Sequence, residues 1–394
     1  MPKIFHQTPK ILFASVLVSL FLASSLIVAL KYTNKTGTSD GTVSLSTVSE
    51  QIYKSCQNED RKERCYAAQF EALTEKRNAR YAYEVLTKLQ ETDQEARACH
   101  LIAHTISATE TRKNPTKWLE IAASFDPNDC SGGFVHGPLE EHLVADPKAK
   151  LDAAVINDVC RRISTPQSGE QNCYHIMGHL IFTTQGGQFP PSLAICSQFE
   201  NTLNKSECYG GIFMENITRE NLVQHDVAQR LSWSEQNARV IEGICSLYPG
   251  LPAQACWKEI VHMYASLFRN DADKVFDRCK RAETTSSTEG CWQHGIGIMT
   301  AGLRFSPEKT ANMCDSAVLP AGFQKTCSLH VVSAMISSSR KNSTNAASFC
   351  SLIGEKFKYS CFQRLHLTLN HFQEDLTAVC SLVEEKYRRV CLEG

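Results

Sequence analysis

Apolar residues along most of the chain recur at intervals of three and four, the spacing of one face of an α-helix. Sustained alternation of apolar and polar residues, which would indicate strands, is scarce. One representative stretch predicts a helix over 273–281, a polar turn over 283–289 and a second helix over 291–303. Ser306 and Pro307 have the residue types of an N-cap and a first helical position, so the next helix is expected to begin there. The pattern predicts an all-α protein.

This two-helix plan repeats, and cysteines mark the repeats. The first cysteine of each pair falls late in the first helix and the second falls early in the second helix. Successive first cysteines are 36, 49, 34, 35, 36 and 30 residues apart. A period near 35 residues is typical of helix–turn–helix units in a helical solenoid. We therefore predict a right-handed α-solenoid, with an insertion around 220–234 in its longest unit.

The cysteines themselves are predicted to form disulfides. There are 18 of them, an even number, and no C-x-x-C motif, which disfavours zinc-thiolate sites. Cysteines that face each other across a tight helical hairpin are within bridging distance. We expect local bridges between Cys56 and Cys65, Cys160 and Cys173, Cys196 and Cys208, Cys245 and Cys256, Cys279 and Cys291, Cys314 and Cys327, Cys350 and Cys361, and Cys380 and Cys391. By elimination, Cys99 should pair with Cys130.

The N-terminal region carries an uncharged apolar run over 11–30. A helix of that length spans about 30 Å, the thickness of the hydrocarbon core of a bilayer. The apolar part of a cleaved signal peptide is usually only about 7 to 15 residues long. We therefore predict an uncleaved signal-anchor, one transmembrane helix, with residues 1–10 in the cytoplasm; a cleaved signal peptide is the alternative. Residues 31–47 are rich in Ser, Thr and Gly and are predicted to be a flexible tether.

Disulfide use places the rest of the chain outside the cytosol. This extracytoplasmic domain (periplasmic, extracellular or luminal) is predicted over 48–394, with a histidine-rich part over 48–185 and regular repeats over 186–394. The charges nearly cancel, with 41 basic and 42 acidic residues, and no basic block is interleaved with aromatic residues. The composition therefore gives no indication of a nucleic-acid partner.

Candidate chemistry is concentrated in the histidine-rich part. Six of the 13 histidines lie there, in three segments that each begin with a cysteine. Three pairs are spaced four residues apart and so share a helix face: His100 and His104, His136 and Glu140, His175 and His179. Counted from the preceding cysteine, His104 is at the fifth position, and His136 and His179 are at the sixth. Equivalent positions in successive units are expected to form one stripe.

We therefore predict a site for a divalent transition metal, zinc or iron, because imidazole and carboxylate groups suit these ions. The predicted ligands are His100, His104, His136 and His179 in one shared cavity, with His142 and His175 as additional ligands. If the metal activates a water, Glu140 or Glu141 is the candidate general base. The alternative is that these histidines are ordinary hydrogen-bonded residues on partly buried helix faces.

One feature of the sequence argues against placing His136 in this stripe of equivalent helix positions. Pro138 fits the first position of a helix that begins near Gly137, which would leave His136 on the preceding loop. A ligand from a loop is compatible with metal binding, but the helical register would then not apply to His136.

Over about 150–394, the repeat length and the cysteine pair between two helices resemble the disulfide-stapled Sel1-like and tetratricopeptide-type solenoids. The resemblance implies binding of protein or peptide partners. Two functions follow. The first is a membrane-anchored, extracytoplasmic binding or scaffold protein with a candidate metal site. The second is a metal-dependent enzyme, a hydrolase or oxidoreductase, that uses His100, His104, His136 and His179.

Overall fold

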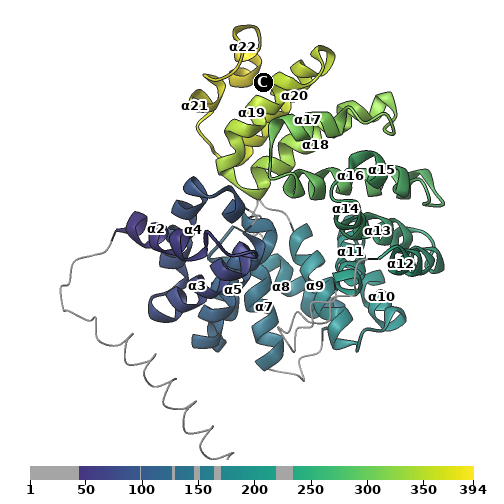
Figure 1. Ribbon diagram of the computed structural model, residues 1–394. Coiled ribbons are helices and arrows are strands. Elements are labelled where there is room, and N and C mark those ends of the chain that lie inside the picture. Colours follow the sequence, from purple (N-terminus) through teal and green to yellow (C-terminus); the bar gives the residue numbers. More distant parts are fainter. Residues whose placement is uncertain (1–43, 98, 127–128, 146–150, 164–169, 219–233) are drawn as a thin grey trace, which may run out of the picture. The chain divides into compact units, whose positions relative to one another are not determined.

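A computed structural model describes residues 44–97, 99–126, 129–145, 151–163, 170–218 and 234–394. These residues form α-helices and short 3₁₀ helices without any strand (Figure 1), so the all-α prediction is confirmed. Residues 45–394 form one compact unit. The predicted signal-anchor at 11–30 lies outside the described residues. Within the described part, no helix has the length and apolar character needed to cross a membrane.

The N-terminal part of the unit contains longer helices joined by 3₁₀ turns. Its elements are α2 (Leu45–Cys56), α3 (Lys62–Lys76), α4 (Ala79–Thr92), η1 (Gln94–Arg97), α5 (His100–Lys113), η2 (Pro115–Lys117), α6 (Trp118–Ala123), η3 (Asp129–Gly132) and α7 (Gly133–Ala145).

From residue 153 onward the helices mostly alternate between a shorter and a longer one. These are α8 (Ala153–Ile163), α9 (Gln171–Thr184), α10 (Phe189–Ser197), α11 (Thr202–Thr218), α12 (Glu235–Leu247), α13 (Leu251–Glu259), α14 (Val261–Leu267), α15 (Ala272–Cys279), α16 (Thr285–Gly302), α17 (Pro307–Cys314), α18 (Ala321–Ser338), η5 (Arg340–Asn342), α19 (Ser343–Leu352), α20 (Glu355–His371), α21 (Leu376–Cys380) and α22 (Glu385–Glu393).

Disulfides fasten each pair of helices. All nine predicted bridges are present, with Cα–Cα separations of 5.0 to 5.7 Å. In the regular pairs the first cysteine lies at or near the end of the first helix, as Cys279 does in α15. Its partner lies within the second helix, as Cys291 does in α16. The predicted cysteine pairing is therefore confirmed, including the bridge from Cys99 to Cys130.

One set of helices forms a row whose members contact one another in sequence order. The contacts run from α5 to α7, α9, α11, α13, α16, α18, α20 and α22 (Figure 1). Side chains at equivalent positions on neighbouring members of this row can therefore meet.

Local helix signals explain one correct boundary and one error. The Ser306 hydroxyl accepts a hydrogen bond from the Lys309 amide and Pro307 opens α17, as predicted. The polar run 283–289, however, is not a turn. Thr284 caps α16 by accepting from the Ser287 amide, so the serines and threonines after it form the first helical turns. A capping hydroxyl satisfies helix amides that would otherwise be unpaired, which allows so polar a segment to start a helix.

The apolar core has two clusters. One is built by α2 to α7 around Phe70, Leu86 and Phe134, and the other extends from α6 to α22. Polar contacts join the N-terminal part directly to η5. The Arg97 guanidinium donates to the side-chain oxygen of Asn342 over 2.9 Å, and Lys341 pairs with Glu91 at 3.0 Å.

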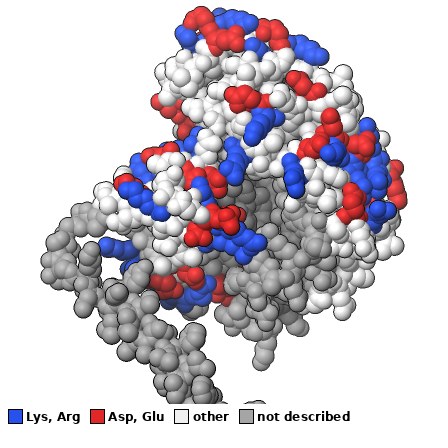
Figure 2. All heavy atoms as spheres, in the orientation of Figure 1, with Lys and Arg blue, Asp and Glu red and all other residues white. Residues whose placement is uncertain are grey.

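On the face drawn in Figure 2, the described Lys and Arg residues are interspersed with Asp and Glu. The visible surface thus has mixed charge, as the nearly balanced composition implies.

Candidate metal centre

Glycines allow the first histidine-bearing helices to approach closely. A Cβ atom added to Gly133 would overlap the His100 carbonyl oxygen, and one added to Gly137 would overlap the His104 carbonyl oxygen. Both glycines lie on α7, four residues apart and thus on one face, and both carbonyls belong to α5. The backbones of α5 and α7 are therefore in contact, which brings histidines on the two helices together.

His136 lies within α7 and not on a loop before it. The helix begins at Gly133 and includes Pro138. Cys130 and Ser131 adopt φ values of 51° and 53°, and this turn directs the chain into the helix earlier than the proline suggests. Pro138 lies in the second turn, where its missing N–H removes one hydrogen bond to the carbonyl four residues before it.

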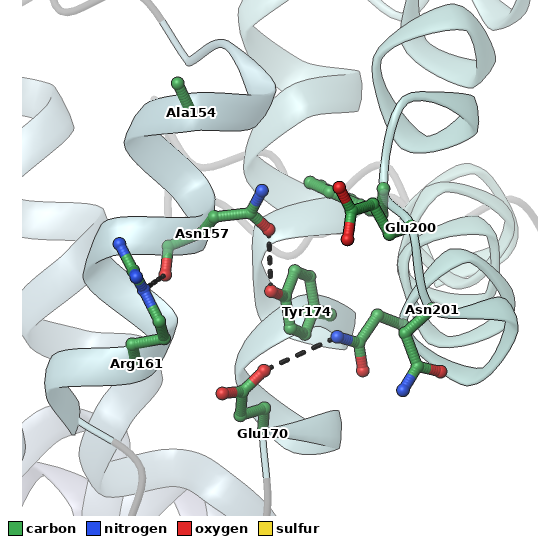
Figure 3. A pocket seen from close by; sticks show the side chains of 9 residues that line it. Ala154, Asn157, Arg161, Glu170, Tyr174, Glu200 and Asn201 are labelled. Atoms are coloured by element: carbon green, nitrogen blue, oxygen red, sulfur yellow. Dashed lines mark hydrogen bonds between the residues drawn. The ribbon is translucent and has the colours of Figure 1, made fainter.

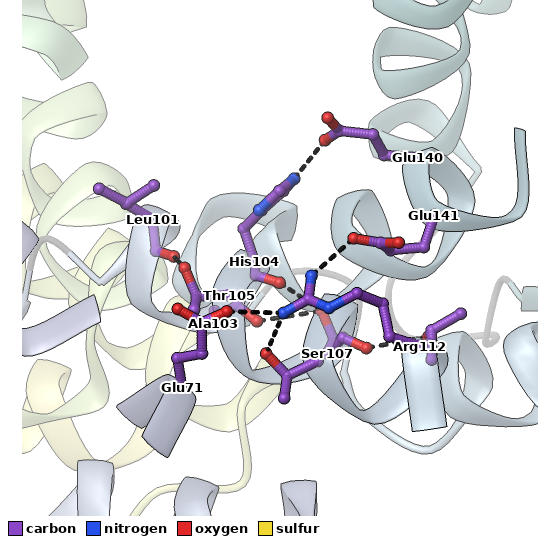
Figure 4. Close-up of polar contacts among 11 residues, drawn as sticks. Glu71, Leu101, Ala103, His104, Thr105, Ser107, Arg112, Glu140 and Glu141 are labelled. Carbon is purple, nitrogen blue, oxygen red and sulfur yellow. Dashed lines mark hydrogen bonds and ion pairs between the residues drawn. The ribbon is translucent and has the colours of Figure 1, made fainter. Parts of the chain in front are cut away.

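The first group consists of His104, His136 and Glu140 and is called the α5–α7 group below. One ligand atom from each of the three lies within 4.8 Å of the others. His104 Nε2 and Glu140 Oε2 are 2.5 Å apart, and the two side chains point toward each other in Figure 4. The His136 ring is 5.0 Å from the His104 ring, and its Nε2 atom is buried without a hydrogen-bond partner.

Two further predicted ligands border this group. The His100 ring is 5.7 Å from the His136 ring, and its Nδ1 atom is 3.1 Å from the Ser131 carbonyl oxygen. The His179 ring, on α9, is 5.4 Å from the His136 ring. His179 Nδ1 is 3.0 Å from Glu215 Oε2 on α11. The structure thus brings His100, His104, His136 and His179 together.

Three other predicted residues have different neighbours. His142 stacks on Trp118, with ring centroids 4.2 Å apart. Glu141 accepts a hydrogen bond from Arg112 over 2.7 Å (Figure 4). His175 is near His179, but its Nε2 is 3.3 Å from the Met214 sulfur. The structure therefore does not bring His142 or Glu141 into the α5–α7 group.

The electrostatics of this site favour the neutral forms of His100 and His136. Burial of His136 lowers its pKa well below the ordinary value, and the neighbouring His104 and His179 lower that pKa further. Desolvation and His104 also lower the pKa of His100. A metal ion binds the neutral form of histidine, so this environment keeps the nitrogen lone pairs available near pH 7.

A second group lies further along the row and was missed from the sequence. It consists of Glu259, His262 and His294, and is called the α13–α16 group below. His294 Nε2 is 3.3 Å from Glu259 Oε2 and 3.2 Å from His262 Nε2. His262 Nε2 is 3.6 Å from Glu259 Oε2. The sequence signal was present, because Glu259 and His294 each stand third after a cysteine and His262 stands sixth.

Charged residues connect the two parts of the row. His175 Nδ1 is 3.7 Å from Glu207, and Glu207 accepts from Lys258 over 3.0 Å. Burial tends to raise the pKa of Glu207, but His175 and Lys258 together lower it to about 2. Gly210 lies between His175 and Glu259, because a Cβ atom there would be 3.0 Å from Glu259 Oε1 and 3.2 Å from His175 Nδ1.

A separate pocket of about 480 Å³ is bordered by α8, α9 and the segment that joins α10 to α11 (Figure 3). The Tyr174 hydroxyl donates to Asn157 Oδ1 over 2.7 Å inside it, and Arg161 and Glu170 are at its edge. None of the histidines described above lines this pocket.

No family model matches this chain, and no curated protein or solved structure is detectably similar to it. The geometry of the two groups is therefore the main indication of function. The resemblance to Sel1-like and tetratricopeptide-type repeats stays a prediction.

Proposed function

We propose that this protein is an extracytoplasmic helical-repeat protein that binds a divalent transition metal through His104, His136 and Glu140. The observation that carries the proposal is the Nε2 atom of His136, which is buried without a hydrogen-bond partner beside the ligand atoms of the other two residues. An unpaired buried polar atom costs about 1 to 3 kcal/mol, and coordination to a metal would remove that cost.

The donor set fits the proposed ions. Two imidazoles and one carboxylate suit Zn²⁺ and Fe²⁺. The hydrogen bond between His104 and Glu140 has to open on binding, because 2.5 Å is shorter than the separation of two ligands on one such ion, about 3 Å or more. His100 and His179 are close enough to complete the coordination or to orient the ligands.

The proposal keeps the compartment, the solenoid architecture and the membrane anchor that were predicted from the sequence. Nine disulfides support an oxidising compartment. The row of contacting helices supports a solenoid that offers a surface to a protein or peptide partner. Anchoring by residues 11–30 belongs to the same proposal and is tested by fractionation of the full chain between membrane and soluble material.

Catalysis is a second candidate, favoured by one observation. A set of two histidines and one carboxylate leaves metal positions open for water or substrate. Glu140 is a ligand in this arrangement, so we take Glu215, held by His179, as the carboxylate left to act as a base. In this case the protein would be a metal-dependent hydrolase or oxidoreductase.

Metal analysis of the purified, disulfide-intact full chain tests the proposal. We expect Zn²⁺ to bind and the change His136→Gln to remove one equivalent. The change His142→Gln is the matched control, since its ring stacks on Trp118 outside the group and binding should be unaffected. Equal metal content in the wild type and in His136→Gln would disprove binding at this site.

A further inference from the structure

The structure assigns a second metal site to Glu259, His262 and His294, with Zn²⁺ as the ion that its geometry fits best. This inference does not depend on the α5–α7 group, because the two groups share no residue. It rests on the positions of three ligand atoms, on one unpartnered carboxylate and on the packing that holds them.

The three ligand atoms form a nearly regular triangle. Its edges are 3.2 Å between the two imidazole Nε2 atoms, and 3.3 Å and 3.6 Å from these atoms to Glu259 Oε2. Around a tetrahedral Zn²⁺ with bonds of about 2.0 to 2.1 Å, neighbouring ligand atoms are about 3.3 to 3.4 Å apart. An octahedral ion with similar bonds needs about 2.9 Å. The triangle therefore matches one face of a zinc tetrahedron and leaves the fourth position for water or another ligand.

Glu259 supplies an independent indication that a cation belongs here. The residue is 0% exposed, and neither of its carboxylate oxygens has a hydrogen-bond partner of good geometry. A buried carboxylate without such partners is costly unless a positive charge lies beside it. An ion bound by Oε2 and the two imidazoles would provide that charge.

One lysine is shared between two carboxylates. Lys258 Nζ is 3.0 Å and 3.1 Å from the two oxygens of Glu207 and 4.0 Å from Glu259 Oε1. With neutral imidazoles, Glu207, Lys258 and Glu259 together carry a net charge of about −1 near neutral pH. A divalent cation therefore enters a site whose surroundings are negative overall.

The helices hold the three ligands in place before any ion arrives. Helix α13 ends at Glu259, and α14 begins at Val261, so the break at Ile260 separates the carboxylate from His262. His294 comes from α16, where Gly295 allows close approach: a Cβ atom there would be 2.9 Å from Val261 Cγ2. Gly210 leaves room for Glu259 on the opposite side.

The test is a Zn²⁺ titration of the full, disulfide-intact chain stripped of metal with a chelator. It is carried out in the His136→Gln background, so that a failure of the α5–α7 group does not affect the result. We expect one remaining equivalent of Zn²⁺, which is lost on adding either His294→Gln or Glu259→Gln. Replacement of the ion by Co²⁺ should give the intense visible absorption of tetrahedral cobalt, and the same two changes should abolish it.

His366→Gln is the matched control. This histidine also lies on a long helix of the row, but both its nitrogens have partners, the Cys391 carbonyl oxygen at 3.1 Å and the Asn370 side chain at 2.8 Å. Zn²⁺ binding should persist in this variant. Circular dichroism checks that each variant is folded, and His262→Gln replaces any variant that is not.

Two outcomes would overturn the assignment. Absence of Zn²⁺ binding in the His136→Gln protein would show that the triangle is only a buried network of ionic and hydrogen-bonded groups. An equivalent that persists after His294→Gln would place the ion elsewhere. If His136→Gln removed all Zn²⁺ binding and His294→Gln alone left it unchanged, the proposed function would be supported and the second site rejected.

Discussion

The α5–α7 group and the α13–α16 group contain the same residue types, two histidines and one glutamate, but they differ in what holds those residues. In the first, glycines bring two helix backbones together and a direct hydrogen bond joins His104 to Glu140. In the second, one oxygen of a fully buried carboxylate is 3.3 Å and 3.6 Å from the Nε2 atoms of two imidazoles. The composition of a site therefore does not determine how ready it is to receive an ion.

The largest expected effect on stability concerns the disulfides nearest the two groups. Cys99 and Cys130 are 31 residues apart, whereas Cys245 and Cys256 are 11 residues apart. In the chain-entropy account, replacing the first pair by serine should lower the free energy of unfolding by about 4 kcal/mol, and replacing the second by about 3 kcal/mol.

Urea unfolding of the two double variants measures this difference. The Cys99 and Cys130 double variant should also lose Zn²⁺ binding at the α5–α7 group only, because its bridge fixes the starts of α5 and α7. A larger loss of stability from the Cys245 and Cys256 variant would contradict the entropic ranking.

The next largest effect is expected from a glycine substitution that affects the α5–α7 group and not the α13–α16 group. In Gly137→Ala the new methyl group would meet the His104 carbonyl, Ser107 Oγ and the Ala108 amide. Forcing the two helices apart should cost about 2 to 3 kcal/mol and weaken Zn²⁺ binding at the α5–α7 group.

Gly243→Ala is the control for that change, since nothing lies within 4 Å of its added Cβ atom on α12. This control should stabilise the protein by about 0.5 to 1 kcal/mol through helix propensity. Thermal unfolding of both variants checks the pair, and equal effects would mean that the close contact of α5 and α7 is unimportant.

Affinities for Zn²⁺ sharpen the comparison further. Metal binding replaces one hydrogen bond in each group, His104 with Glu140 at 2.5 Å and His262 with His294 at 3.2 Å, but only the second distance already matches that between two ligands of one ion. We expect the α13–α16 group to bind Zn²⁺ at least about tenfold more tightly, which corresponds to about 1.4 kcal/mol. Competition with a coloured chelator, using His136→Gln and His294→Gln to isolate each group, measures both constants. The reverse order would show that preformed geometry is not decisive.

The smallest expected effect is a difference in pH dependence without metal. The pKa of His136 is lowered well below 6.5, so the unfolded chain binds more protons in acid, and the free energy of unfolding falls as the pH drops below about 6.5. His136→Gln should flatten that slope by at most about 1.4 kcal/mol per pH unit.

The α13–α16 group should respond in a different range. Burial raises the pKa of Glu259, but His294 and His262 outweigh it and lower the pKa well below 4.5. The stability it contributes is present above about pH 4.5 and is lost at lower pH, so Glu259→Gln should alter the slope only there. Urea unfolding from pH 3 to 8 in chelator compares the two variants, and identical slopes would contradict both assignments.

The sequence predicted the repeats well because their signals are local. Cysteine spacing and the Ser306–Pro307 cap each depend on a few neighbouring residues, and the structure has both features. The convergence of His104, His136 and His179 followed from register, since equivalent positions on contacting helices meet. His142 does not join them because it lies six residues after His136, which places it on another side of α7.

The α13–α16 group could not be assembled in the same way. His262 and His294 are single histidines in separate helices, and neither forms a histidine pair within its own helix. Glu259 ends one helix just before a break, so its direction depends on how α13 and α14 join. Such a site is set by tertiary packing, and sequence spacing alone gives too little information to recognise it.

The contacts of η5 with the N-terminal part have a consequence for how the protein unfolds. In an open array each unit touches only its neighbours, so units can melt one after another from either end. Here Arg97 and Glu91 bind Asn342 and Lys341, which couples the first helices to η5 in the C-terminal half. The enclosed stretch, with both histidine groups, should therefore unfold cooperatively, whereas α20 to α22 beyond it are left to fray, and their amides should exchange with solvent first.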